Sequence, residues 1–214
     1  MRTINLSTLL LISLVSSSFG KYSLPPLEKP IVDPSTGLNV PPGFEVELIH
    51  KVNKQKHGSW IAMAFDKQGR LTVSDQQKAG TFSLEIPKAG EKVDETKIKK
   101  LNVESSLYGM LYAFDHLYMM GNRKLTRAKV MADGSLGPTE FLAEMAGGGE
   151  HGPHSIIVSP DGKSIYVIAG NATQAPKFQK SRIPTNWKDD VLLENYAYGH
   201  MSQGKAPGGW VMRL

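Results

Sequence analysis

The chain has 214 residues, of which 40% are hydrophobic and 21% are charged, values that are ordinary for a globular protein. Its net charge of +5 comes from scattered lysines and arginines, and without a nucleic-acid motif it does not indicate binding to nucleic acid. The absence of cysteine excludes disulfides, thiolate metal sites and covalent haem attachment within this chain. The length is sufficient for one large domain or two small ones.

The first twenty residues have the pattern of a secretory signal. Arg2 supplies a positive charge, residues 6–15 form an apolar stretch, and residues 16–20 end in small side chains. This pattern predicts a signal peptide over residues 1–20, cleaved after Gly20 and too short to span a bilayer as a mature helix. No later run is apolar enough for a transmembrane helix, so we expect a periplasmic or secreted protein without a membrane span.

Residues 21–42 contain seven prolines and glycines and little periodicity, which predicts an extended arm or linker. From residue 43 onward, apolar or alternating runs bounded by turn residues predict a series of β-strands. In chain order these strands are residues 44–50, 60–65, 70–74, 81–86, 106–114, 117–120, 124–130, 139–145, 155–158, 163–169 and 208–214. No segment has apolar residues at helical spacing over ten positions, so the fold class is all-β.

The stretch GGGEHGPHSIIVSPDGKSIYVIAGN, residues 147–171, combines a glycine-rich loop with a predicted hairpin. The turn between its two strands is Ser-Pro-Asp-Gly, in which proline presets φ and glycine supplies a positive φ. Glu150, His151 and His154 lie on the loop before the first strand. Histidine titrates near neutrality and is the first candidate for a general base. Two interpretations stay open, an acid–base or ligand cluster and a hydrogen-bonded turn.

A repeated pattern occurs at residues 62–75, 111–121 and 156–171. In each case an apolar strand is followed by an aspartate-containing turn and then by a β-rich return strand. The aspartates of the three turns, Asp66, Asp115 and Asp161, are 49 and 46 residues apart. This period is typical of a β-propeller blade and is favoured over a β-sandwich. Residues 43–214 are sufficient for about three blades, fewer than a closed propeller needs. We therefore expect a partial β-propeller and an N-terminal fragment of a longer protein.

The segment EHGPHSIIVSPDGKSIYVIAGN resembles the histidine-bearing blade of the sorbosone and soluble glucose dehydrogenase superfamily. The chain is most similar to the secreted propeller proteins of planctomycetes and verrucomicrobia that are known as membrane-bound dehydrogenase-domain or haem-binding proteins. The motifs that carry this resemblance, in chain order, are PPGFEVELIH, GSWIAMAFDKQGRLTVSDQ, GMLYAFDHLYMM, SRIPTNWKDDVLL and APGGWVMRL. The resemblance covers most of residues 41–214.

The resemblance implies a six-bladed propeller that carries pyrroloquinoline quinone supported by calcium, with His151 as the base that takes the substrate hydroxyl proton. This chain departs from the quinoprotein pattern at two positions, Ser155 where arginine is usual and Asn171 where aspartate is usual. The remaining quinone and calcium ligands of that pattern correspond to blades beyond Leu214. Haem belongs to a separate cytochrome c domain, a candidate electron acceptor that this chain does not contain.

Two functions remain open. The first is a dehydrogenase for a sugar-derived alcohol or aldehyde, with His151 as general base and Glu150 orienting it. The second is a non-catalytic propeller that binds glycan or protein through a face rimmed by aromatic residues, namely Trp60, Trp187, Tyr196 and Trp210. Core positions are the simpler interpretation of Trp60 and Trp210. Substrate-binding candidates are His154 and Asn171, together with Arg182 and His200 on the long 172–207 loop. The adjacent Asp189 and Asp190 do not have the spacing of a calcium loop, so no metal site is predicted.

Overall fold

The computed structural model describes residues 31–33, 37–145, 147, 151–174 and 208–214. Antiparallel β-strands dominate this part of the chain, and its helical segments are only α1 (Lys54–His57) and the 3₁₀ turn η1 (Glu95–Lys97). The all-β prediction is therefore confirmed. Within the same residues, no helix is both long enough and apolar enough to cross a membrane.

The described residues up to Val46 belong to a unit of their own, which contains a small hairpin. Its strands β1 (Ile31–Val32) and β2 (Asn39–Val40) pair antiparallel. Gly37 has a φ of 69°, in the left-handed region that glycine tolerates, and its N–H donates to Asp33 O at 2.8 Å. The described part of the proline-rich arm thus folds back on itself, whereas its composition alone predicts an extended chain.

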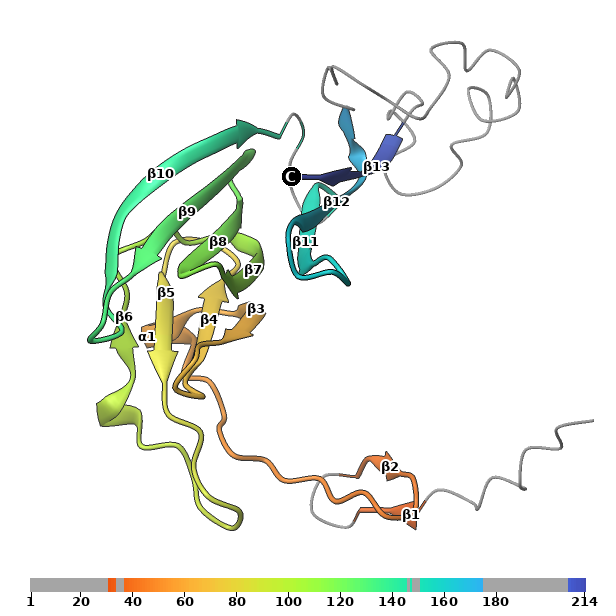
Figure 1. Cartoon of the computed structure of the whole chain (residues 1–214). Helices are drawn as coiled ribbons and strands as arrows, with labels where there is room; N and C mark the ends of the chain where they lie inside the picture. The colour runs from red at the N-terminus through yellow and green to blue at the C-terminus, as the bar shows by residue number, and fades with distance from the viewer. Residues whose placement is uncertain (1–30, 34–36, 146, 148–150, 175–207) are drawn as a thin grey trace, which may run out of the picture. The chain divides into compact units, whose positions relative to one another are not determined.

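The second unit, residues 47–214, contains three antiparallel sheets that follow one another along the chain (Figure 1). The first comprises β3 (Trp60–Phe65), β4 (Leu71–Asp75), β5 (Thr81–Leu84) and β6 (Lys99–Lys100). The second comprises β7 (Leu107–Ala113), β8 (His116–Gly121), β9 (Lys124–Val130) and β10 (Leu136–Glu144). The third comprises β11 (Pro153–Val158), β12 (Ile165–Gln174) and β13 (Gly208–Arg213). In each sheet the strands pair in sequence order, so each is an up-and-down meander.

Apolar side chains fill the spaces between consecutive sheets. Ala62 and Ala64 of β3 pack against a buried cluster of the second sheet that includes Leu107, Leu117 and Met119. The other face of the second sheet packs on the third sheet through a cluster of buried side chains: Tyr118, Met120, Leu125, Met145, Ile156, Ile165, Val167, Ala169 and Trp210. The first strand of the second sheet, β7, contacts the first strands of both neighbours, β3 and β11. Successive meanders packed face to face through their first strands are blades, and the chain is a partial β-propeller with three of them.

Strand alternation explains which face is buried. Ala62 and Ala64 point toward the second sheet, while Ile61, Met63 and Phe65 lie on the opposite face and are exposed. On the third sheet, Ile157, Ile168 and Val211 are exposed on the face turned away from the second. Trp210 is 7% exposed in the core, and Trp60 packs against the buried residues of the first sheet, as the core interpretation of both tryptophans predicts.

The repeated sequence plan corresponds to the first hairpin of each sheet. Each of the three aspartate-containing turns is flanked by two strands: β3 and β4, β7 and β8, or β11 and β12.

Two local predictions are wrong. Residues 44–50 alternate in polarity but form no strand, since in the described chain no strand pairs with them and Phe44 and Leu48 are 71% and 58% exposed. The second turn consists of Phe114 and Asp115, so that His116 begins β8 instead of belonging to the turn.

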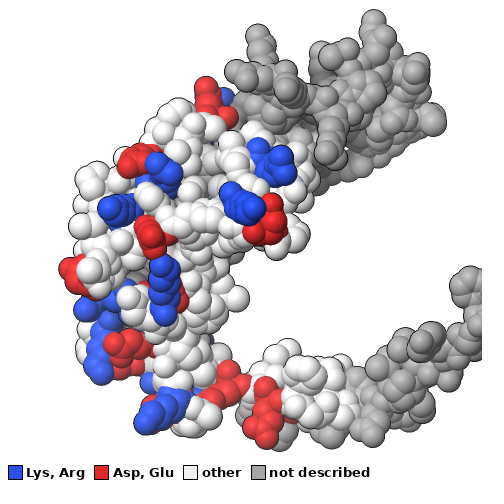
Figure 2. Space-filling model, in the orientation of Figure 1, with Lys and Arg blue, Asp and Glu red and all other residues white. Residues whose placement is uncertain are grey.

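Charged side chains of both signs are interspersed on the face of the molecule drawn in Figure 2. Among the described residues, some charged side chains pair directly, for example Arg127 Nε with Glu140 at 2.8 Å and Lys124 Nζ with Glu104 at 3.2 Å. This face has no continuous basic patch, in keeping with the scattered charge of the sequence.

Candidate functional site

Of the six site residues predicted from the sequence, the structure describes His151 and His154 together with the backbone of Asn171. Glu150, Arg182 and His200 lie outside the described residues, as do Trp187 and Tyr196 of the predicted aromatic rim. His151 and His154 are both half-buried, at and just inside the start of β11.

The loop that carries His151 is held against the second half of β12. Gly170 N–H donates to Gly152 O at 2.8 Å, and Gly147 forms an isolated antiparallel bridge with Thr173. These backbone contacts place His151 beside Gly170, the residue immediately before Asn171. The predicted base His151 thus lies against Gly170, one residue before the predicted substrate ligand Asn171. Asn171 lies within β12, which continues past the predicted strand end at residue 169.

Gly170 is required for this close approach. A Cβ at this position would lie 2.5 Å from His151 O and 3.0 Å from its carbonyl carbon, closer than side-chain carbons approach a backbone. The absence of a side chain therefore lets the loop rest directly on the strand. Gly170, near the end of the predicted hairpin, thus positions the loop that carries the candidate base His151.

His154 is positioned by the neighbouring sheet. Its ring meets that of Tyr108 on β7 edge to face, with centroids 5.9 Å apart and an interplanar angle of 89°. Gly109 makes this contact possible, since a Cβ on it would lie 2.1 Å from His154 O. Tyr108 was not predicted from the sequence, because it lies 46 residues from His154 within an apolar strand and no local motif marks it.

A second group of aromatic rings lies at the start of the first sheet. His50 stacks on Trp60 with centroids 5.3 Å apart, and His57 meets the edge of Phe82 at 5.1 Å. His50 Nε2 and His57 Nδ1 are buried without a hydrogen-bond partner. Trp60 Nε1 donates to His57 O at 3.1 Å, so this group closes one end of the first blade around the tryptophan.

Within residues 31–33, 37–145, 147, 151–174 and 208–214, no three His, Cys, Asp or Glu side chains are grouped closely enough to hold a metal ion. At Ser155, four residues after His151, the chain does not match the quinone site of the resembled enzymes. Ser155 is exposed and supplies a neutral hydroxyl where those enzymes usually carry arginine, so it brings no positive charge to the carboxylates of pyrroloquinoline quinone. No chemical step is therefore assigned to that cofactor here.

No protein-family model matches this chain, and no curated protein matches it. Among solved structures, it is similar to iodide and calcium structures of a Trichoderma reesei protein of Carbohydrate-Active Enzymes Family AA12, with a TM-score of 0.49 and 14% identity over 66% of this chain in each case. It is also similar to the PQQ-bound form of an aldose sugar dehydrogenase from Streptomyces coelicolor, with a TM-score of 0.37 and 17% identity over 55% of this chain. The matches span 34% and 39% of the length of those two proteins.

Proposed function

We propose that this chain is part of an exported β-propeller oxidoreductase that oxidises a sugar-derived alcohol or aldehyde, with His151 as the general base. The observation that supports this proposal best is the backbone clamp at Gly170, which holds the loop with His151 against β12 and beside Asn171. A base acts efficiently only when its position relative to the substrate is fixed, and a clamp of this kind reduces the motion of the loop.

In the proposed reaction, His151 accepts the proton of the substrate hydroxyl as the carbon that bears it is oxidised. The hydrogen on the same carbon leaves with the electron pair of its C–H bond to a two-electron acceptor, which the described residues do not provide. An imidazole is suited to this role because histidine is the side chain that most often serves as a general base in enzymes. Glu150 is proposed to orient His151, while His154, Asn171, Arg182 and His200 are proposed to bind substrate oxygens.

His154 and His151 have different places in this scheme. The ring of His154 is engaged with Tyr108 across the gap between two blades, which suits a group that holds substrate or stabilises the blade contact. His151 lies on the loop itself, three residues earlier. The pair therefore offers a matched comparison of two imidazoles at one site.

The test is a dye-linked oxidation assay of the protein expressed from its native gene, against a panel of sugars, sugar alcohols and aldoses. The His151→Ala variant is expected to lower kcat and kcat/KM together by about 10² or more, as for loss of a general base. The His154→Ala variant is expected to act mainly on KM or on stability. Full activity of a folded His151→Ala protein would refute the assignment and favour the glycan- or protein-binding propeller instead.

A further inference from the structure

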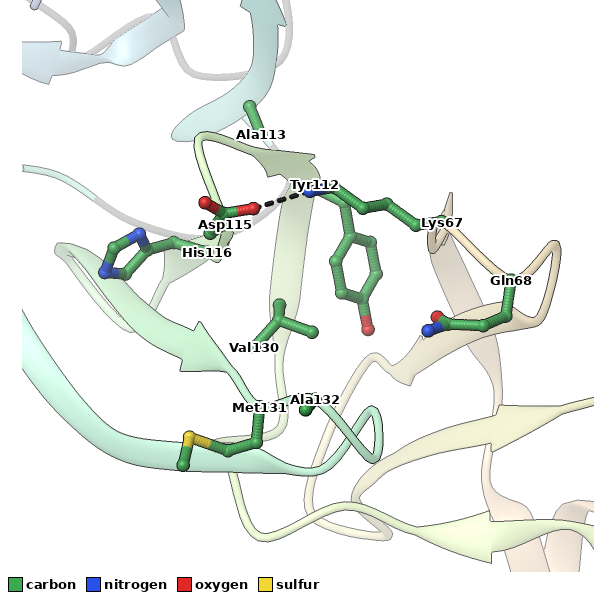
Figure 3. Close-up of a pocket in the computed structure, with 9 residues that line it drawn as sticks. All are labelled: Lys67, Gln68, Tyr112, Ala113, Asp115, His116, Val130, Met131 and Ala132. Atoms are coloured by element: carbon green, nitrogen blue, oxygen red, sulfur yellow. Dashed lines mark hydrogen bonds and ion pairs between the residues drawn. The ribbon is translucent and has the colours of Figure 1, made fainter.

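A pocket of about 220 Å³ lies between the first and second blades (Figure 3). It is formed by the β3–β4 turn, the β7–β8 turn and the end of β9 with the residues after it. Gly109, near the start of β7, contacts His154, whereas the β7–β8 turn lies at the far end of the same strand. The pocket and the candidate site are therefore separate.

The floor of the pocket is apolar. Tyr112, Val130 and Met131 line it together with Ala113 and Ala132. The Tyr112 hydroxyl is already bonded to Thr72 Oγ1 at 2.8 Å, and burial raises the pKa of this phenol above its ordinary value. The hydroxyl is thus both satisfied and protonated, and Tyr112 offers the pocket chiefly the surface of its ring.

The polar side chains that line the pocket are Lys67 and Asp115, one full charge of each sign, with the amide of Gln68 and the imidazole of His116. Figure 3 shows the Lys67 side chain extended toward Asp115, with which it forms an ion pair that joins the two blades. The hydrogen bond from Lys67, followed by the charge of Lys67, lowers the pKa of Asp115, which is therefore a carboxylate at neutral pH. The two side chains are 74% and 70% exposed, and an ion pair as exposed as this contributes little to stability. A ligand that carries both a negative and a positive group can therefore separate Lys67 from Asp115 and pair with each of them at a small cost in free energy.

The turn that presents Asp115 is strained. Phe114 and Asp115 have φ values of 50° and 58°, a left-handed conformation that is unusual for residues other than glycine and especially for a bulky aromatic. Val130 N–H donates to Asp115 O at 2.8 Å, and a His116 ring nitrogen lies 2.7 Å from Phe114 O. Such strain persists where the surrounding structure imposes it, and it concentrates at ligand sites. Here it fixes the carboxylate at the pocket rim.

From this arrangement we propose that the pocket binds a free α-amino acid with an aliphatic side chain, such as leucine. Its carboxylate pairs with Lys67, its ammonium group pairs with Asp115, and its side chain covers Tyr112, Val130 and Met131. A sugar would turn hydroxyls toward the apolar floor, and a fatty acid or an alkylamine would leave one charge at the rim without its partner. An α-amino acid carries both charges on one carbon above an apolar group.

The binding test uses the whole protein labelled with ¹³C at its methionine methyl groups. Met131 lies in the pocket wall, while Met63 is 69% exposed on β3 outside the pocket and serves as an internal control. Titration with L-leucine is expected to shift the Met131 signal, assigned with a Met131→Leu variant, and to leave that of Met63 unchanged. The analogues 4-methylpentanoate and 3-methylbutylamine, each lacking one charge, are expected to bind about two- to fivefold more weakly, the range for one exposed ion pair.

Two substitutions test the charges separately. Lys67→Met and Asp115→Asn are each expected to weaken leucine binding about two- to fivefold, the range for one exposed ion pair. Asparagine tolerates the left-handed conformation at position 115, so the turn is retained. Lys163→Met, at an exposed lysine of the β11–β12 turn, is the matched control and should bind as the unaltered protein does. The proposal is overturned if leucine does not shift Met131, if either analogue binds as tightly as leucine, or if both folded variants retain full affinity.

Discussion

The packing between the second and third blades is sensitive to a substitution at Gly109. A Cβ placed on it would lie 2.1 Å from His154 O and 2.9 Å from the carbonyl carbon. Ordinary van der Waals contact for such a carbon begins at 3.4 Å. The Gly109→Ala variant therefore requires the backbone of β11 to retreat by about 1 Å, since a backbone oxygen cannot rotate away as a flexible side chain does.

The cost of this displacement is expected to be about 1–3 kcal/mol, the usual range for overpacking of a well-packed core. The φ of Gly109 is not in the left-handed region, so backbone strain adds nothing to the effect. Alanine also restricts the unfolded chain, which stabilises a protein by about 0.4–1 kcal/mol where the site accepts it. A net destabilisation of about 1–2 kcal/mol is the expected result.

Gly137 provides the matched control. It also lies in a strand and also lacks a positive φ, but the nearest atom to its Cβ position is Lys129 O at 3.5 Å, an ordinary contact. Urea unfolding followed by tryptophan fluorescence measures both variants, and Trp210 reports directly on the interface between the second and third blades. Gly137→Ala should be neutral or slightly stabilising. Equal stability of Gly109→Ala and Gly137→Ala would show that β11 does not lie against β7 as described.

Asp75 is 2% exposed, and although burial raises its pKa, hydrogen bonds from backbone N–H groups such as those of Ser59 and Ala79 outweigh it, so the pKa is lowered below 3.8. The contribution of Asp75 to stability is therefore present above about pH 4 and is lost as the pH falls through the lowered pKa. The Asp75→Asn variant should lower the free energy of unfolding, measured with urea at pH 7, by about 1–3 kcal/mol. The difference between the variant and the unaltered protein should shrink in acid. Gly170→Ala, which forces the His151 loop away by up to about 1 Å, should lower kcat/KM by about 10² in the dye-linked assay, and unchanged kinetics would contradict the role of the clamp. N-terminal sequencing of exported protein should begin at residue 21, and any other start would contradict cleavage after Gly20.

The strands and turns of the three blades could be predicted from the sequence because their causes are local. Alternating side chains and turn residues such as Asp-Gly determine where a strand ends, whatever lies opposite. Asp66 illustrates this, since it accepts hydrogen bonds from the N–H groups of Gln68 and Arg70 within its own turn, and Asp161 bonds similarly to Lys163 N. The periodic recurrence of these hairpins was sufficient to indicate a propeller.

The aspartates of the repeat are alike in the sequence and different in the structure. Asp115 does not cap its own turn with its side chain but pairs with Lys67 of the preceding blade, and the turn that carries it has two positive φ values without a glycine. The pocket beside this pair depends on two turns that are about 50 residues apart in the chain. No local pattern reports such a distance.

The candidate site also has features that the sequence predicts and features that only the tertiary structure determines. Histidines on a glycine-rich loop marked its position in the sequence, because residue type and chain flexibility are local properties. Only the tertiary structure brings Gly170 under His151 and Tyr108 beside His154, and only it leaves residues 44–50 without a strand partner despite their alternation. The reason is that the chemistry of a side chain depends only on its residue type, which the sequence states. Close approach of two backbones, contact between two rings and pairing of two strands each need a second segment of the chain. The packing of whole sheets decides where that second segment lies.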